Sequence, residues 1–128
     1  VMNTYPDSKD LLYPTIKEKV IHNADEMEIE VPPDLADRGR VPLMREAIGL
    51  ARKEIGGTVP VGSYVLGPFT LAGQIMELND LLKLSFKKKD KVAKLLDDLT
   101  AVIIAVAKEY ESAGVDFICV REMGATSD

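Results

Sequence analysis

A glutamate at the end of a predicted strand is the residue best placed for chemistry in this sequence. Glu122 follows the mostly apolar residues 115–120, and Gly67-Pro68-Phe69-Thr70 follows a second apolar run at residues 59–66. Ligands of α/β proteins gather beyond the carboxyl ends of parallel strands, where a carboxylate can act as a general base, bind a metal or pair with a cation. The structural alternative, which position alone does not separate from these roles, is that Glu122 pairs with Arg121 or caps a helix.

The segment after the first apolar run has the composition of a tight turn from a strand into a helix. The amides around Gly67-Pro68 could approach a substrate. Thr70 is expected to cap the following helix, with contact to a ligand as the less favoured alternative. A carboxylate such as Glu122 at a solvent-filled strand end is expected to contribute little to folding stability.

Other reactive side chains favour structural roles. Cys119 lies inside an apolar strand and is expected to be a small core residue. His22 is expected at the surface or in a hydrogen bond. Residues 87–89 form a lysine run that is expected to join two helices and to be solvated. Asp97 and Asp98 are adjacent, so they do not share a helix face and do not form a metal pair. No P-loop, GxGxxG, CxxC, HExxH or GxSxG motif is present.

Composition excludes several classes of protein. The chain has 128 residues, 46% hydrophobic and 29% charged, which is typical of one globular domain rather than of a disordered chain. The net charge of −5 and the absence of Trp argue against nucleic-acid binding. No apolar run approaches the roughly 20 residues of a membrane span. One cysteine cannot form an internal disulfide, which suits a reducing compartment, and we expect the cytoplasm.

The elements that must position Glu122 follow from hydrophobic periodicity. Residues 1–39 are expected to be an irregular lead-in with short pieces of structure, and residues 40–128 to form α/β units. A helix is predicted over 41–55 and a buried strand over 59–66. A second helix is predicted from Pro68 past Leu82, and a third carries a broad apolar stripe as far as Gly114. A buried strand over 115–120 follows.

A helical crossover between the two strands predicts an α/β fold in which they are parallel neighbours. Gly67 and Glu122 should then lie at the same end of the sheet. Two parallel strands are not a complete α/β domain, so we expect one fragment of a longer polypeptide, internal to it and inactive alone. Its open sheet edges predict a dimer or higher homo-oligomer.

Three stretches of sequence resemble the uroporphyrinogen decarboxylase superfamily. Val65-Leu66-Gly67-Pro68-Phe69-Thr70-Leu71-Ala72-Gly73 is similar to its strand–turn–helix signature. Glu111-Ser112-Ala113-Gly114-Val115-Asp116, leading into a strand that ends in an acid, is similar to its next unit. The lead-in Glu30-Val31-Pro32-Pro33-Asp34, followed by Arg40-Val41-Pro42 and a helix, also resembles it. The likeness covers residues 24–128.

This resemblance implies part of a (β/α)8 barrel, from one of two branches. The decarboxylases, which act in porphyrin biosynthesis, have a tyrosine where Gln74 stands and Asp-Ser where Glu122-Met123 stands. These departures, with Gly124-Ala125-Thr126-Ser127-Asp128, make the chain more similar to the corrinoid-dependent methyltransferases. That branch moves a methyl group from a methylated corrinoid protein to coenzyme M, tetrahydrofolate or a similar acceptor.

The methyltransferase branch implies a site, a cofactor and partners. Glu122 would be the catalytic residue, and the substrate-binding residues would be Gly67, Pro68, Thr70, Gln74 and Arg121. A methylcobamide would be the methyl donor, carried by a corrinoid protein, and a small molecule would be the acceptor. Zinc, where this branch uses it, would be bound through a His-x-Cys motif and a later Cys outside these residues. A decarboxylase and a non-enzymatic small α/β module remain the alternatives.

Overall fold

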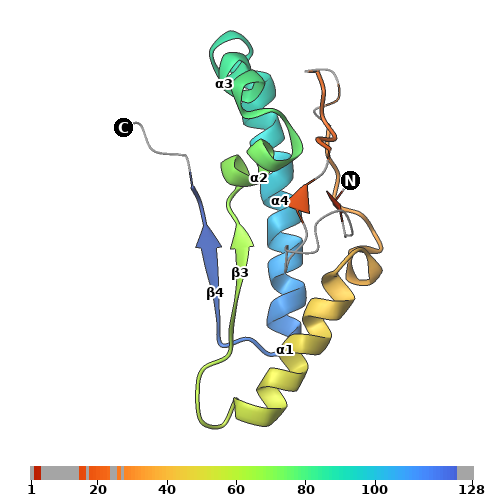
Figure 1. The fold of residues 1–128 in the computed structure, drawn as a ribbon, viewed down its shortest axis with the longest axis vertical. Coiled ribbons are helices and arrows are strands. Elements are labelled where there is room, and N and C mark those ends of the chain that lie inside the picture. The colour runs from red at the N-terminus through yellow and green to blue at the C-terminus, as the bar shows by residue number, and fades with distance from the viewer. Residues whose placement is uncertain (1, 4–14, 17, 24–25, 27, 124–128) are drawn as a thin grey trace.

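The computed structural model describes residues 2–3, 15–16, 18–23, 26 and 28–123 (Figure 1). Within them the long helix α4 (Lys89–Ala113) runs alongside a pair of strands, β3 (Gly62–Leu66) and β4 (Phe117–Arg121). Helix α1 (Val41–Ile55) packs on the lower part of α4, and α2 (Pro68–Ile75) and α3 (Leu78–Lys87) lie beyond the tips of the strand arrows in Figure 1. From α1 onward the order is the one predicted from the hydrophobic pattern, except that two helices, α2 and α3, stand where one was predicted.

The pair β3–β4 confirms the central topological prediction. The strands are parallel, in a register that runs from Gly62 opposite Phe117 to Leu66 opposite Arg121. Both are shorter than predicted: β3 begins only after Val59 and Pro60, because proline has no amide to donate to a ladder. The carboxyl ends of both strands point toward α2, so Gly67 and Glu122 lie at the same end.

Helix α1 begins and ends as the sequence predicts, and α4 ends as predicted. Pro42 lies in the first turn of α1, and Arg52 and Lys53 lie in its last turn, where cations stabilise the helix dipole. Helix α4 ends at Gly114, which has a φ of 104°. That left-handed conformation strains any residue with a Cβ, so the glycine is the reason for the stop.

The predicted second helix is instead two helices. α2 ends at Ile75, and Met76 is extended with a φ of −127° and ψ of 156° before α3 begins at Leu78. The break is a tertiary effect: Val20 and Ile21 both donate backbone amide protons to the Ile75 carbonyl, at 2.9 Å. The lysine run is also less of a linker than predicted, because α3 extends through Lys87 and α4 starts at Lys89. The lysine side chains are exposed, as expected.

The lead-in contains the short elements that were expected and one core residue that was not. Strands β1 (Met2–Asn3) and β2 (Thr15–Ile16) pair antiparallel, and a 3-10 turn, η2, covers Leu35–Asp37. Ile21 bridges to Met76 and is only 4% exposed. Nearby, the Lys19 ammonium donates to the Gly73 carbonyl at 2.8 Å. The lead-in therefore holds the end of α2 in place.

Two hydrophobic clusters hold the helices and the sheet together. The first joins the lead-in with α2, α3 and α4, and its largest fully buried side chains are Met76, Leu81 and Leu95. The second joins α1, β3 and α4 through Ile48, Val65 and Tyr110. Burial raises the pKa of the Tyr110 hydroxyl, with the nearby Tyr64 adding to the effect. α4 contributes to both clusters and is the common support.

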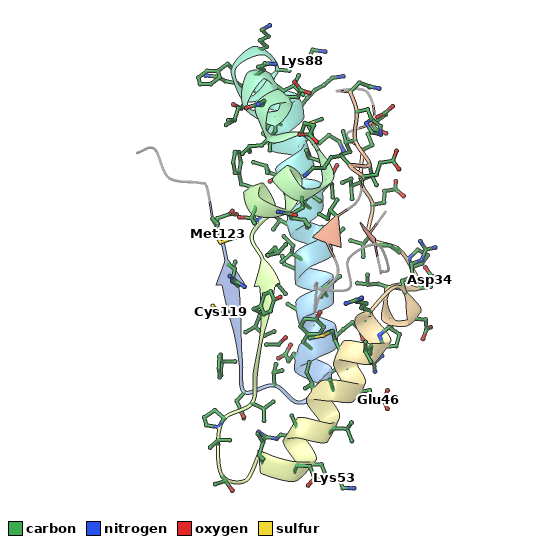
Figure 2. The ribbon with its side chains drawn as sticks, viewed as in Figure 1. Asp34, Glu46, Lys53, Lys88, Cys119 and Met123 are labelled. Carbon is green, nitrogen blue, oxygen red and sulfur yellow. The ribbon has the colours of Figure 1, made fainter. Side chains whose placement is uncertain are left out.

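The prediction that both strands and Cys119 are buried is wrong. In β3 only Val65 is buried. In β4 only Ile118 is half-buried, Phe117 and Val120 are 55% and 61% exposed, and Cys119 is exposed as a free thiol. Figure 2 shows Cys119 on the side of β4 away from α4. The apolar pattern was read correctly as a strand, but helices cover only one face of the pair in the described part of the chain.

Candidate active site at the strand ends

Glu122 closes the carboxyl end of the sheet by binding the first turn of α2. One carboxylate oxygen accepts the Phe69 backbone amide at 3.1 Å, and the other accepts the Thr70 amide at 2.8 Å. These amides are among the groups that a helix leaves unpaired at its N-terminus, where a negative charge is stabilising. Of the two structural alternatives for Glu122, the structure shows the helix cap. The catalytic role of Glu122 stays a prediction.

Thr70 ties the same turn to the residue after Glu122. It is the third residue of α2 and 7% exposed. Its hydroxyl binds the Glu122 carboxylate and also accepts the Met123 amide at 2.6 Å. The expected cap by Thr70 itself is wrong: Gly67 is the N-cap, makes no side-chain bond, and the capping oxygens come from β4. Thr70 instead fixes the chain as it leaves the sheet.

Gly67 makes this contact possible because it has no side chain. A Cβ at Gly67 would overlap the Glu122 carboxylate and lie 2.6 Å from its Cδ and 2.9 Å from its Cβ. The backbone at Gly67 is extended, with a φ of −72°, so the requirement is one of space rather than conformation. The Gly67 amide also donates to the Arg121 carbonyl at 2.8 Å, one step beyond the ladder.

A small cavity adjoins this turn, and two of the predicted site residues, Thr70 and Gln74, line it. It has a volume of about 220 Å³, and its lining residues are Phe69, Thr70, Gly73, Gln74, Leu78, Leu82 and Met123. Gln74 presents an exposed amide, while Leu78 and Leu82 are 49% and 41% exposed. Pro68 is half-buried in the turn itself and does not line the cavity. The cavity can hold a small ligand with an apolar body and one polar contact.

Arg121, in contrast, turns away from Glu122. Its guanidinium carbon lies 5.1 Å from the centroid of the Tyr64 ring. The predicted residues are thus divided: Glu122 and Thr70 lie at the first turn of α2, Gln74 lies near the end of α2 beside the cavity, and Arg121 lies on the face of the sheet. Tyr64 was not predicted as a site residue, although strand alternation and the parallel register would have placed it on the same face as Arg121.

A second carboxylate holds the amino ends of the two strands together, and it was not among the residues predicted from the sequence. Asp116 accepts the Val61 amide at 2.8 Å, and its two oxygens accept the Arg52 guanidinium at 2.6 and 2.7 Å. The Val61 amide, followed by Arg52, lowers the pKa of the Asp116 carboxyl below its ordinary value. This end of the sheet lies away from the turn of α2, so its role is structural.

The remaining candidates contribute no site of their own. His22 is exposed, as expected, and its backbone amide donates to Glu26 at 2.9 Å. Asp98 forms an ion pair with Lys94 at 2.7 Å. Across the described ranges, no group of three or more His, Cys, Asp or Glu side chains could hold a metal ion. These residues therefore do not fit a zinc site. In the same part of the chain no helix is long and apolar enough to cross a membrane.

Comparisons with known proteins agree on a single family. The family model for uroporphyrinogen decarboxylase (URO-D) matches residues 4–127. A methylcobamide:CoM methyltransferase, MtaA, from Methanosarcina barkeri is 37% identical over 77% of this chain. A methylated-thiol–coenzyme M methyltransferase from Methanosarcina mazei is 25% identical over 78% of the chain. The matched region spans 29% and 27% of the lengths of these two relatives.

A solved structure confirms the predicted fold class. A methyltransferase from Methanosarcina mazei superimposes with a TM-score of 0.81 and 30% identity, covering 95% of this chain and 35% of its own. With the parallel pair β3–β4 and its helical crossover, this shows an α/β chain with the architecture of a partial (β/α)8 barrel. By the extent of the family match, the chain belongs to the uroporphyrinogen decarboxylase (URO-D) family.

Proposed function

We propose that this chain is part of a methyltransferase that moves a methyl group from a methylated corrinoid protein to the thiol of a small acceptor. The observation that carries the proposal is the likeness, over 77% of the chain, to proteins named methylcobamide:CoM methyltransferase. The geometry supports it, since the first turn of α2, which Glu122 binds, and the adjoining cavity lie at the carboxyl ends of the strands, where (β/α)8 barrels have their active sites. Tetrahydrofolate, the other acceptor class expected from the sequence, has no such support.

The proposed reaction is a displacement at carbon. The acceptor thiolate attacks the cobalt-bound methyl group, a carbon–sulfur bond forms, and the cobalt–carbon bond breaks with its electron pair left on cobalt. The described residues supply position rather than proton transfer. The first turn of α2 holds the rim of the site, and Gln74 and Thr70 line the cavity beside it. Holding two reactants in a fixed orientation is itself a large catalytic effect.

Glu122 acts in this proposal through the turn that it holds. Both of its oxygens accept hydrogen bonds from the start of α2, so its carboxylate fixes Gly67-Pro68-Phe69-Thr70 against the end of β4. We expect Glu122→Gln to lower methyl transfer by at least about tenfold, as do changes to groups that orient reacting groups. A direct contact with the acceptor would instead lower kcat with no loss of stability.

The free edges of β3 and β4 indicate where the remaining strands of the barrel would pair. We propose that residues 1–128 form one unit, a lead-in at 1–39 and α/β units at 40–128, and that further strands pair with the free edges of β3 and β4. A groove of about 500 Å³ runs along β3; its lining includes Arg40 and Met44 on one side and Tyr110 on the other. Such edges and grooves are normally covered. The 128 residues alone are accordingly expected to be inactive.

The assay is demethylation of methylcobalamin by the full-length protein, followed by absorbance, with 2-mercaptoethanesulfonate as acceptor. Thiol-dependent loss of the methyl group is expected. Glu46→Gln is the matched control for Glu122→Gln, because Glu46 is exposed on α1 and far from the strand ends (Figure 2). If no thiol accepts the methyl group, the proposal is wrong, whether a folate accepts it instead or uroporphyrinogen loses carbon dioxide. The exposed thiol of Cys119 suits a reducing compartment, and we propose the cytoplasm.

A further inference from the structure

The C-terminal end of α2 is held by residues of the lead-in. A helix leaves its last carbonyl groups without partners of its own. In α2 the Gly73 carbonyl accepts a hydrogen bond from the ammonium of Lys19, a half-buried residue 54 positions earlier, at 2.8 Å. The Ile75 carbonyl accepts the backbone amides of Val20 and Ile21. The helix has no basic residue in its last turn, where a cation is stabilising, so Lys19 supplies that cation from outside.

Helix α2 depends on such support because it is only eight residues long. Helices shorter than about 12–15 residues are marginal in isolation. Its first turn is bound by the Glu122 carboxylate, which follows β4, and its last turn by the Lys19 ammonium of the lead-in. An anion at the start of a helix and a cation at its end both stabilise the helix dipole. Charged side chains of two other segments therefore fix α2 at its two ends.

The contacts with the lead-in lie where two walls of the 220 Å³ cavity meet. Gly73 and Gln74, near the end of α2, line one wall, and Leu78, at the start of α3, lines the other. A Cβ at Gly73 would lie 3.6 Å from the Leu78 side chain, so the two walls are close at this point. Between the helices, the extended Met76 pairs with Ile21, which is buried. The lead-in therefore fixes the direction in which α3 leaves α2, and with it the shape of the cavity.

We infer that Lys19 is a positioning residue of the candidate active site: its ammonium holds the end of α2 and so sets the shape of the cavity. Lys19 does not line the cavity and acts through the Gly73 carbonyl. The inference rests on the proposed function for the reaction that the cavity serves. It adds the lead-in, in which the sequence indicated no candidate for catalysis, to the segments that this reaction needs.

Hydrogen exchange of the full-length protein, followed by mass spectrometry, tests whether Lys19 holds the end of α2. Lys19→Met keeps a long side chain but removes the donor, so the amides of residues 73–76 should exchange roughly 3- to 10-fold faster, the range expected for the loss of one hydrogen bond. Exchange in α1 and α4 should not change. Lys19→Arg keeps a cationic donor and should restore most of the protection. Lys53→Met, which removes an exposed lysine of α1, is the matched control (Figure 2).

Kinetics of methyl transfer from methylcobalamin to a thiol test whether this hold matters for the reaction. Because a fixed orientation of the reactants accelerates the chemical step, Lys19→Met should lower kcat by roughly 3- to 10-fold while the KM for methylcobalamin changes by less than about twofold. Lys19→Arg should recover most of kcat, and Lys53→Met should match the wild type. A residue that serves folding alone would lower the melting temperature and leave kcat, counted per folded molecule, at the wild-type value.

The two measurements distinguish this inference from the proposed function. Faster exchange at residues 73–76 together with a lower kcat, both recovered by Lys19→Arg, supports the inference. Unchanged exchange in Lys19→Met overturns it, and so does faster exchange with an unchanged kcat, while methyl transfer by the wild type still stands. If the wild type transfers no methyl group to any thiol, the proposed function fails, and the exchange at residues 73–76 alone decides whether Lys19 holds the cavity wall.

Discussion

Replacing Glu122 by glutamine tests whether the carboxylate at the end of β4 holds the fold as well as the site. The wild-type oxygens accept two amides, from Phe69 and Thr70, and the Thr70 hydroxyl. Glutamine keeps the shape but has one acceptor oxygen, and its amide nitrogen would face a donor. Its single oxygen can take only one of the two places, so either the Phe69 amide or the Thr70 amide would be left facing an N–H donor.

The expected loss of unfolding free energy is about 1–2 kcal/mol. Removing a side-chain cap costs about 0.5–2 kcal/mol, and removing a negative charge from a helix N-terminus costs about 0.3–1 kcal/mol. The two overlap, so they are not added in full. With a urea m-value of about 2 kcal/mol/M for a chain of this size, the unfolding midpoint should fall by roughly 0.5–1 M. The sequence alone led us to expect almost no change, because it did not show the cap.

Urea unfolding of the 128-residue chain, followed by far-ultraviolet circular dichroism at neutral pH, measures this shift. Glu46→Gln makes the same chemical change on an exposed helix face and should stay within about 0.5 kcal/mol of wild type. Gly67→Ala disrupts the same contact between Glu122 and α2, since the Cβ of alanine would displace the Glu122 carboxylate. Because both changes remove the same bonds, the double variant should lose clearly less than the sum. Additive losses, or no shift in Glu122→Gln, would refute the cap.

Four further outcomes are expected. Leu95→Ala, at a fully buried position of α4, should lower the unfolding free energy by about 2–5 kcal/mol in the same urea titration. The pKa of Asp116 is lowered in the folded chain, so its contribution to folding stability is present above the unfolded pKa and is lost as the pH falls through the folded pKa. Acid should therefore lower the melting temperature less in Asp116→Asn than in wild type. Cys119 should react with a thiol reagent in the native chain as fast as in urea, and slow reaction would mean that its face is covered. Sedimentation should give a dimer or higher oligomer burying more than roughly 1,500 Å², and a monomer at all concentrations would contradict the open-edge argument.

The elements that depend on local pattern were predictable, and those that depend on tertiary contact were not. Helices α1 and α4 and the parallel pair follow from periodicity, a glycine stop and the length of the crossover. The break between α2 and α3 did not follow, because it lies where Met76 pairs with Ile21, a residue distant in the sequence. Burial of Ile21 itself was invisible in an irregular, proline-containing stretch. Exposure of Cys119 was equally hidden, since an apolar strand looks the same whether one face or two are covered.

The candidate site was half predictable for a related reason. Topology placed Glu122 and the Gly67 turn at one end of the sheet, and the structure confirms that placement. What each side chain binds depends on distances across the strand ends, which no one-dimensional pattern contains. Glu122 therefore proved to be bound to α2 amides rather than to Arg121, and Arg121 proved to lie over Tyr64.

The two carboxylates that flank β4 have a consequence for insertions and deletions. Asp116 comes immediately before the strand and accepts the amide of Val61, which immediately precedes β3; Glu122 comes immediately after and accepts amides just beyond Gly67. The five paired residues are therefore fastened at both ends. A strand advances about 3.3 Å per residue, more than a hydrogen bond can stretch. One residue added to or removed from either strand must release one of the two fastenings, so evolution can vary the loops around this pair but not its length.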